Sequence, residues 1–304
     1  MQAHPRSVGA AALIVTALSV APAFAEPFRL EKQFDLAAGD RFVLISDVGG
    51  VALRGVAGRQ ASIIVTSDRE DLAERCAFRF EQGAGRLKMV VECKQKGLRN
   101  WFQQSRGNVH IAVEVPRATP VDLQTAGGAI DLSALDASVK ASSSGGGVKV
   151  ADVHGAVRLE SSGGGVRAES IDGSVYADTS GGSLTIETVS GDIEASSSGG
   201  GVHIQGAGGR VKASSSGGPV RVVFAAGNSK GGDLDSSGGG VVATVDSAAG
   251  IDVDAESSGG SVHCDLPVTI RGRVSGDSLY GKLNGGGALL RLRSSGGGIS
   301  INPR

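Results

Sequence analysis

A six-residue motif, SSGGGV, recurs along this chain at a nearly constant spacing. Four copies match it fully and a fifth ends in Ile, and they lie at 143–148, 161–166, 197–202, 236–241 and 294–299. With the variants TAGGAI, TSGGSL, SSGGPV and SSGGSV included, the first glycines fall at 127, 145, 163, 181, 199, 217, 238 and 259, in steps of 18 and then 21 residues. Self-similarity at a fixed period in this range indicates stacked structural units.

Each repeat contains two segments in which apolar and polar residues alternate. In the unit SSGGGVKVADVHGAVRLE, residues 143–160, one such segment follows the glycines and a second follows Gly155. Alternation at period two is typical of a strand with one buried face. We therefore predict an all-β fold, a single-chain parallel β-solenoid (β-helix) with 18–21 residues and two short strands per coil, and we expect the right-handed form.

Stacking of the units places equivalent residues about 4.8 Å apart, so the apolar positions form two inward rows. One row contains Val148 and Val166, and the other contains Val139 and Val157. We expect the glycines at the corners, because Gly adopts positive φ readily and lets neighbouring backbones approach closely. The serines beside them are expected to form a hydroxyl ladder that satisfies backbone groups at each corner.

The first 25 residues have the pattern of a secretory signal peptide. They contain basic residues near the start, an apolar run over 10–20, and small residues at Ala23 and Ala25 before the expected cleavage point. The chain contains no apolar stretch long enough to span a membrane. We expect the mature chain, 26–304, to be exported and to be periplasmic or extracellular, at the cell surface.

Within 26–304 the sequence predicts one domain, with irregular N-terminal coils over 26–120 and regular repeats with an enlarged last coil over 121–304. A hairpin over 76–93 would place Cys76 opposite Cys93. In an oxidising compartment this favours a cross-strand disulfide, and two unlinked buried thiols are the alternative.

Two segments depart from the repeat. The basic segment KQKGLRNWFQQSRGN, 94–108, contains Trp101 and Phe102, which could contact a partner or a membrane surface, or could instead cover an open edge of the fold. The last strand, 299–301, ends close to the end of the sequence. It would leave an unpaired edge open to strand addition or end-to-end self-association.

Several of these segments together resemble a known family. A leading SDVGGVAL, a strand ending in VP at 115–116, TAGGAI at 125–130, and a close on LNGGG and SSGGGI are similar to the bacterial putative-adhesin β-solenoid family, long catalogued as a domain of unknown function. The resemblance covers about residues 28–302. It implies a single-domain β-solenoid at the cell envelope and transfers no catalytic residue. The uniform SSGGG repeats and the inserted basic segment depart from the family pattern.

A candidate binding strip follows from the residue after each core Val. This row, the basic ridge, is Lys149, Arg167, Thr185, His203, Arg221, Val242 and His263. A largely cationic row floored by small residues could bind an anionic glycan through Lys149, Arg167, His203, Arg221 and His263. Glu169 and Glu187 lie two residues further along and oppose this interpretation, and an ordinary solvated face is the alternative.

An acidic cluster on the opposite face suggests a different function. Aligned by repeat, Asp233 would stack on Asp254, and Asp235 on Glu256. Paired carboxylates can serve glycan hydrolysis or hold a divalent cation. If the last coil closes in phase, however, Arg291 would fall next to Asp254 and Arg293 next to Glu256, which would make an ion-pair network instead.

The sequence as a whole predicts a non-enzymatic exported envelope protein, an adhesin-like binding protein or a scaffold that presents flat outer faces. The alternatives are a carbohydrate-active enzyme that uses Asp233 and Asp254, and a self-assembling structural solenoid. The expected partner is an anionic polysaccharide or an envelope protein, and no nucleic acid, because the formal net charge is −1. The sequence has no phosphate-binding, dinucleotide or zinc motif, so we expect no cofactor and no metal.

Overall fold

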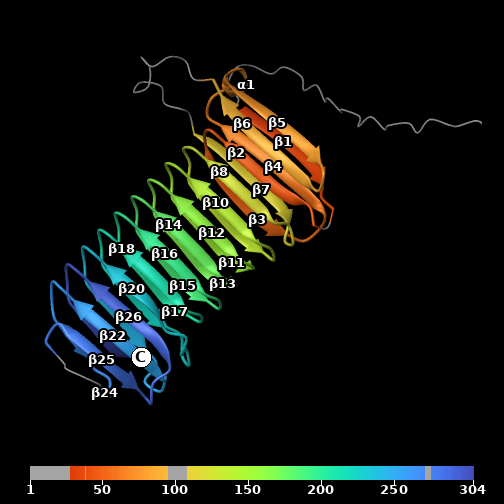
Figure 1. The fold of residues 1–304 in the computed structure, drawn as a ribbon. Coiled ribbons are helices and arrows are strands. Elements are labelled where there is room, and N and C mark those ends of the chain that lie inside the picture. Colours follow the sequence, from red (N-terminus) through yellow and green to blue (C-terminus); the bar gives the residue numbers. More distant parts are fainter. Residues whose placement is uncertain (1–27, 38, 95–107, 271–274) are drawn as a thin grey trace, which may run out of the picture.

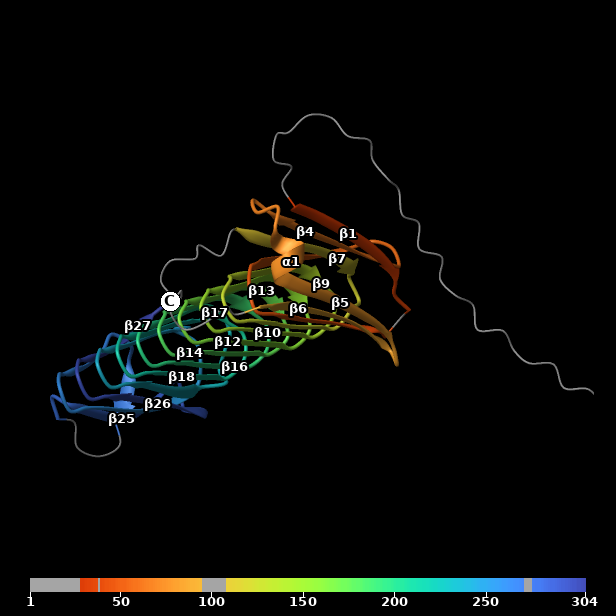
Figure 2. The ribbon, with the colours of Figure 1, turned by 90° about the horizontal axis from the view of Figure 1, so that it is seen from above.

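The protein is all-β, with two sheets built largely from parallel strands (Figure 1). The computed structural model describes residues 28–37, 39–94, 108–270 and 275–304. Its described helix content is the single turn α1 (Leu72–Arg75), which lies at the N-terminal end of the stack (Figure 2). The signal peptide predicted over residues 1–25 lies outside the described residues.

The described strands form two long sheets. Sheet A contains, in spatial order, β1 (Phe28–Asp35), β4 (Gln60–Ser67), β7 (Val109–Pro116), β3 (Gly50–Val56), β9 (Ile130–Leu135), β11 (Val148–His154), β13 (Val166–Asp172), β15 (Leu184–Val189), β17 (Val202–Ala207), β19 (Val220–Phe224), β21 (Val241–Val245), β27 (Ile299–Pro303) and β23 (Val262–Cys264). Sheet B contains, from the same end, β5 (Cys76–Gly83), β6 (Arg86–Cys93), β2 (Arg41–Ser46), β8 (Val121–Thr125), β10 (Val139–Ser143), β12 (Val157–Ser161), β14 (Val175–Thr179), β16 (Ile193–Ser197), β18 (Val211–Ser215), β20 (Gly232–Ser236), β26 (Ala288–Ser294), β22 (Ile251–Ser257), β25 (Ser278–Leu283) and β24 (Val268–Ile270).

Each regular repeat contributes one strand to each sheet, and neighbouring repeats pair in parallel and in phase. Val148 pairs with Val166 in sheet A, and Val139 pairs with Val157 in sheet B. All four side chains are buried, in a core that both sheets supply. The two parallel strands per repeat and the two inward rows predicted from the sequence are confirmed.

The serine ladder expected at the corners is present, and the first serine of each pair forms it. The Ser161 hydroxyl donates to the Gly146 carbonyl of the neighbouring repeat at 2.9 Å and accepts the Gly164 N–H at 3.0 Å. Equivalent hydroxyls donate to a glycine carbonyl at 2.7–2.9 Å, and they belong to Ser143, Thr179, Ser197, Ser215, Ser236, Ser257 and Ser294. The second serine of the pair, such as Ser162, is exposed.

The glycines at these corners are required by close approach of the chain to itself. A Cβ on Gly164 would lie 2.3 Å from the backbone nitrogen of Gly147 in the neighbouring repeat. Gly182 and Gly218 meet the same obstacle, at 2.4 and 2.5 Å. Any other residue at these positions would push the repeats apart and break the serine bonds.

Strands of sheet A bend at a point that the alternation did not reveal. Asp152, Ser170 and Thr188 adopt left-handed φ values of 54–55°, and Ala134 and Gly206 hold the same place with φ of 61° and 72°. After the inward residue Val150, two outward residues precede the next inward one. The bend therefore recurs in five consecutive strands, β9 to β17, and is absent from β19 and β21, which keep simple alternation.

The coils at both ends are out of sequence order. Sheet A runs β7, β3, β9 at one end and β21, β27, β23 at the other, while sheet B runs β6, β2, β8 and β20, β26, β22. In the sequence, β22 and β23 come before β26 and β27. In space, β26 lies between β20 and β22, and β27 lies between β21 and β23. The predicted unpaired edge at 299–301 is therefore wrong, because β27 is hydrogen-bonded on both sides.

Aromatic side chains close the N-terminal end. Phe28 of β1 stacks on Phe78 of β5 with ring centroids 5.6 Å apart, and Phe34 lies 5.5 Å from Phe80. These contacts join the edge strand of sheet A to the edge strand of sheet B. They cover the end of the aliphatic core.

The hairpin β5–β6 has the register expected from the sequence. Phe78 pairs with Val91 and Phe80 with the buried Met89. Cys76 pairs with Cys93, and a disulfide joins the two residues.

The serine ladder generates a stability prediction. We expect Ser161→Ala to lower the free energy of unfolding by about 1–3 kcal/mol, because it leaves a half-buried carbonyl and a half-buried N–H without partners. Ser161→Thr should cost less, since Thr179 fills the same position in the next repeat. Ser162→Ala is the matched control and should have little effect. Urea denaturation measures the differences, and equal effects of Ser161→Ala and Ser162→Ala would contradict this account.

The disulfide generates a second prediction. Replacement of Cys76 and Cys93 by Ala should lower the free energy of unfolding by about 2–4 kcal/mol, because the bond closes a loop with a sequence separation of 17. Thiol titration of the denatured, unreduced protein should find one free thiol, that of Cys264. Three free thiols in protein from an oxidising compartment would contradict the bond.

Candidate functional site

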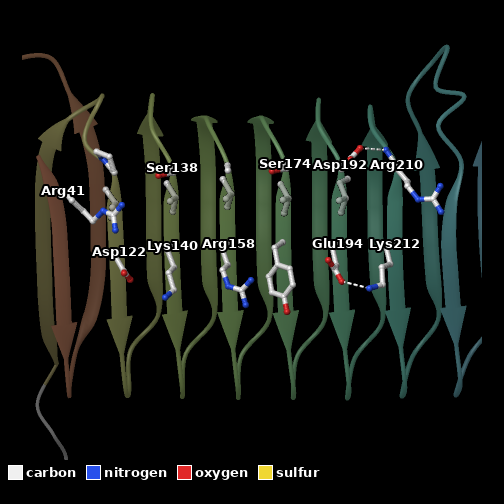
Figure 3. A pocket seen from close by; sticks show the side chains of 18 residues that line it. Arg41, Asp122, Ser138, Lys140, Arg158, Ser174, Asp192, Glu194, Arg210 and Lys212 are labelled. Carbon is white, nitrogen blue, oxygen red and sulfur yellow. Dashed lines mark hydrogen bonds and ion pairs between the residues drawn. The ribbon is translucent and has the colours of Figure 1, made fainter. Parts of the chain in front are cut away.

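A shallow groove of about 640 Å³ crosses the outer face of sheet B (Figure 3). It extends over the first residues of β8, β10, β12, β14, β16 and β18, and Arg41 at the start of β2 borders one end. Six strands at the usual spacing give it a length of about 24 Å. The groove is therefore long and open, and its direction is perpendicular to the strands.

Two rows of side chains line the groove. The second residue of each strand gives the groove row, and its members are Asp122, Lys140, Arg158, Tyr176, Glu194 and Lys212. The in-phase register places each member beside the next. Just before the strands, the small residues Ser138, Ala156 and Ser174 leave space above the sheet.

One half of the groove is internally paired. The Lys212 ammonium lies 2.7 Å from the Glu194 carboxylate, and Asp192 accepts the backbone N–H of Arg210 at 2.8 Å. The Arg210 guanidinium lies 2.7 Å from Asp233. Asp233 follows Lys212 in the groove row, on the neighbouring strand β20. Each acidic group in this half is already engaged by a donor of the protein.

The other half contains groups without protein partners. One carboxylate oxygen of Asp122, Oδ1, is buried and has no hydrogen-bond partner. Among the residues that the structure describes, Arg41 and the Asp122 neighbour Lys140 form no ion pair. This end of the groove can therefore offer two free cations and one free acceptor to a ligand.

Tyr176 provides an aromatic surface in the middle of the groove. The Arg158 guanidinium carbon lies 3.9 Å from the centre of the Tyr176 ring, and Arg158 also pairs with Glu160. The hydrogen bond that Arg158 donates to Glu160 holds the pKa of Arg158 above its ordinary value. Tyr176 itself is half-buried, so its ring is held in place and still reaches the groove.

The basic ridge lies on the outer face of sheet A, on the other side of the molecule. Its members pair in register in the order Lys149, Arg167, Thr185, His203, Arg221 and Val242. His263 does not follow Val242, as the sequence alignment suggested. Because β27 lies between β21 and β23, Ser300 separates the two residues.

The ridge charges are partly neutralised. Arg167 forms ion pairs with Glu169 and with Glu187, the latter at 2.9 Å. The Arg167 hydrogen bond holds the pKa of the Glu169 carboxyl below its ordinary value. His263 lies 2.7 Å from Asp265. The ridge is thus less cationic than its sequence suggests, and its binding of a glycan stays a prediction.

The expected stack of Asp233 on Asp254 is wrong. Strand β26 lies between β20 and β22, so Arg291 occupies the position between the two carboxylates. Arg291 lies 3.5 Å from Asp233 and 3.7 Å from Asp254. The paired acids required by the enzyme interpretation are separated by a cation.

The second expected pair has the same arrangement. Arg293 lies between Asp235 and Glu256 in the register, 3.6 Å from Glu256 and 2.9 Å from Asp254. The bond to Asp254 raises the pKa of Arg293. The in-phase closure of the last repeat is confirmed, and it produces an ion-pair network.

Three further features concern the segment with Trp101 and Phe102, a metal site and a membrane span. Trp101 and Phe102 are outside the described residues. In the described ranges, no group of three or more His, Cys, Asp or Glu side chains is placed to hold a metal ion. None of the described helices is long and apolar enough to cross a membrane.

Sequence reasoning missed the groove. In both the groove row and the basic ridge, each member directly follows the first buried residue of its strand. The basic ridge belongs to the strands of sheet A and the groove row to those of sheet B. The available signal was Tyr176, one of two tyrosines in the chain, within a run of charged equivalents. The hollow itself depends on side-chain volumes in the preceding row, which the alternation pattern does not report.

No protein-family model and no curated protein matches the sequence. Solved structures that are similar to this chain include a putative adhesin from Bacteroides fragilis. It has 10% identity over 91% of this chain and 97% of that chain, with a TM-score of 0.42. A putative lipid binding protein from Parabacteroides distasonis has 12% identity over 90% and 96%, with a TM-score of 0.42. A putative adhesin from Parabacteroides merdae has 13% identity over 90% and 95%, with a TM-score of 0.40. Similarities of this size carry no argument about function.

The ridge generates a pKa prediction. Arg167→Ala should raise the pKa of Glu169 toward its ordinary value, because the hydrogen bond that stabilises the carboxylate is lost. Lys149→Ala should raise it less, since Lys149 acts only through a weaker charge interaction. Carboxyl-carbon NMR over a pH series measures both shifts.

The sign of the pH effect follows from the depressed pKa. The ion pair stabilises the fold above about pH 4.3, the unfolded value of a glutamate, and loses its effect as the pH falls through the lower folded-state value. A Glu169 pKa unchanged by Arg167→Ala would show that Arg167 is free.

Proposed function

We propose that this chain is a non-enzymatic binding protein exported to the bacterial cell envelope, and that the groove on sheet B is its binding face. The observation that supports this most is the half of the groove with unengaged groups, Arg41, Lys140 and the buried Oδ1 of Asp122. Buried polar groups in folded proteins normally find partners, so the unpaired Oδ1 of Asp122 is an exception, and it lies beside two exposed cations that a ligand can reach.

The proposed fold is a single right-handed parallel β-solenoid over residues 26–304, exported after removal of residues 1–25. The in-phase pairing of successive repeats, as between Val148 and Val166, supports the solenoid. The disulfide between Cys76 and Cys93 supports export, because such bonds persist in oxidising compartments. The resemblance to the putative-adhesin family supports an envelope location.

A binding role fits the geometry better than catalysis. A hydrolase that acts on glycans needs two carboxylates that flank one bond. Arg291 lies between Asp233 and Asp254 and pairs with both, and Arg210 and Arg293 each add a second cation to one of them. The paired strands beneath the groove make a rigid base, and a preorganised surface loses little entropy when it binds.

The proposal predicts groove-dependent binding to envelope material. Purified mature protein is mixed with isolated envelope fragments, and the bound fraction is measured by co-sedimentation. The groove variant, Arg41→Ala with Lys140→Ala, should bind about tenfold more weakly, the effect of about 1.4 kcal/mol. Its two cations have no ion pair to lose, so the fold should persist.

The control is a variant of equal charge change on sheet A, Lys149→Ala with Arg221→Ala, which should bind like the wild type. Loss of binding in this ridge variant alone would move the site to the basic ridge. Absence of envelope binding by the wild type would reject the proposed function.

A further inference from the structure

We propose that the groove on sheet B binds a linear acidic polysaccharide, with one sugar ring against Tyr176 and a sugar carboxylate at Lys140 and Arg41. This inference rests on the proposed function and names the ligand class for the same site. Four features of the groove each require one property of the ligand.

The first requirement is negative charge. The groove is lined by five basic and three acidic side chains, and the acids Asp192 and Glu194 are engaged by Arg210 and Lys212. Lys140 and Arg41 remain without an ion pair in the described part of the chain. A ligand group at this end must therefore be an anion, and a carboxylate fits the ammonium and the guanidinium alike.

The second requirement is a hydrogen-bond donor next to that anion. An ionised carboxylate only accepts hydrogen bonds, and Oδ1 of Asp122 accepts none from the protein. That oxygen is enclosed, but Oδ2 of the same carboxylate is not, and no described group donates to it. A ligand hydroxyl can donate to Oδ2, whereas a polyanion without hydroxyls would meet a like charge there. The ligand must carry hydroxyl and carboxylate groups on neighbouring units.

The third requirement is a ring with an apolar face. Tyr176 is half-buried two strands from Lys140, and Arg158 lies between the two in the register. Aromatic rings attract the slightly positive C–H groups of a neighbour to their negative face. Arg158 covers one face of the Tyr176 ring, so the sugar would meet the opposite face. A pyranose ring combines a C–H face with hydroxyls at its rim, so it can contact that face and the charged side chains together.

The shape of the groove requires a polymer. The groove is about 24 Å long, and it crosses neighbouring strands at a repeat of about 4.8 Å. Successive sugars of an extended chain are spaced comparably, so one chain can pass from Tyr176 to Asp122 with a ring over each strand. The small residues Ser138, Ala156 and Ser174 leave the path along which it would lie.

Binding of defined polymers to the purified mature protein tests the inference by calorimetry. The probes are polygalacturonate, alginate and hyaluronate as acidic polysaccharides, methyl-esterified polygalacturonate as the neutral match, and polyglutamate as a polyanion without sugar. We expect at least one acidic polysaccharide to bind, and polyglutamate and the ester to bind at least about tenfold more weakly.

Variants assign the contacts. Tyr176→Ala, Lys140→Ala and Asp122→Ala should each weaken binding about tenfold. Tyr280→Ala is the matched control on sheet B, since Tyr280 is exposed on β25 and away from the groove, and Lys149→Ala is the control on sheet A. Both controls should bind like the wild type. Circular dichroism and a melting curve for each variant separate lost contacts from lost folding.

Three results would overturn the inference: polyglutamate binding as tightly as the best polysaccharide, Tyr176→Ala behaving like Tyr280→Ala, or none of the acidic polysaccharides binding. If none binds while groove-dependent sedimentation with envelope fragments persists, the ligand class is wrong and the binding function stands. If both fail, the binding function is wrong as well.

Discussion

The hydrogen bond at each corner is the interaction on which the rest of this structure depends. One serine hydroxyl, such as that of Ser161, joins the carbonyl of one repeat to the N–H of the next corner. The bond can form only because a glycine without Cβ lets the two backbones approach closely. Repeated at every corner, it locks neighbouring repeats in phase. The core rows, the ridge and the groove row all follow from that phase.

The order of the end repeats shows how the fold deals with its open ends. A stack of parallel strands leaves unpaired edges that invite association. Here the last strand, β27, has β23 outside it, and β26, β2 and β3 each have two or three strands between them and the nearest edge. The edges are given instead to β1 and β5, joined by phenylalanine pairs such as Phe28 with Phe78, and to the three-residue strands β23 and β24. The insertion of β26 and β27 between strands that precede them in the sequence requires non-local contacts, and such contacts slow folding.

The repeat predicted the two strands per unit, their register and the buried serine ladder, because each follows from period and alternation. It also placed Arg291 in phase with Asp254. It could not place β26 between β20 and β22, because a period fixes the phase of a repeat and not its position in the stack. The left-handed bend at Asp152 was missed since no glycine marks it, and Thr188 accepts the same conformation. The groove was missed because it depends on side-chain volume.

Both outer faces are built from parallel strands in phase, yet they differ in how their charges are satisfied. On sheet A, Glu169 and Glu187 engage Arg167, so the charge is balanced within the protein. On sheet B, Asp122 and Lys140 are neighbours in the register and still form no ion pair, and one carboxylate oxygen is buried alone. A buried acceptor without a partner costs about 1–3 kcal/mol. At the corners, serine hydroxyls satisfy the backbone polar groups, whereas in the groove one buried acceptor stays unsatisfied. Such local exceptions are expected at functional sites.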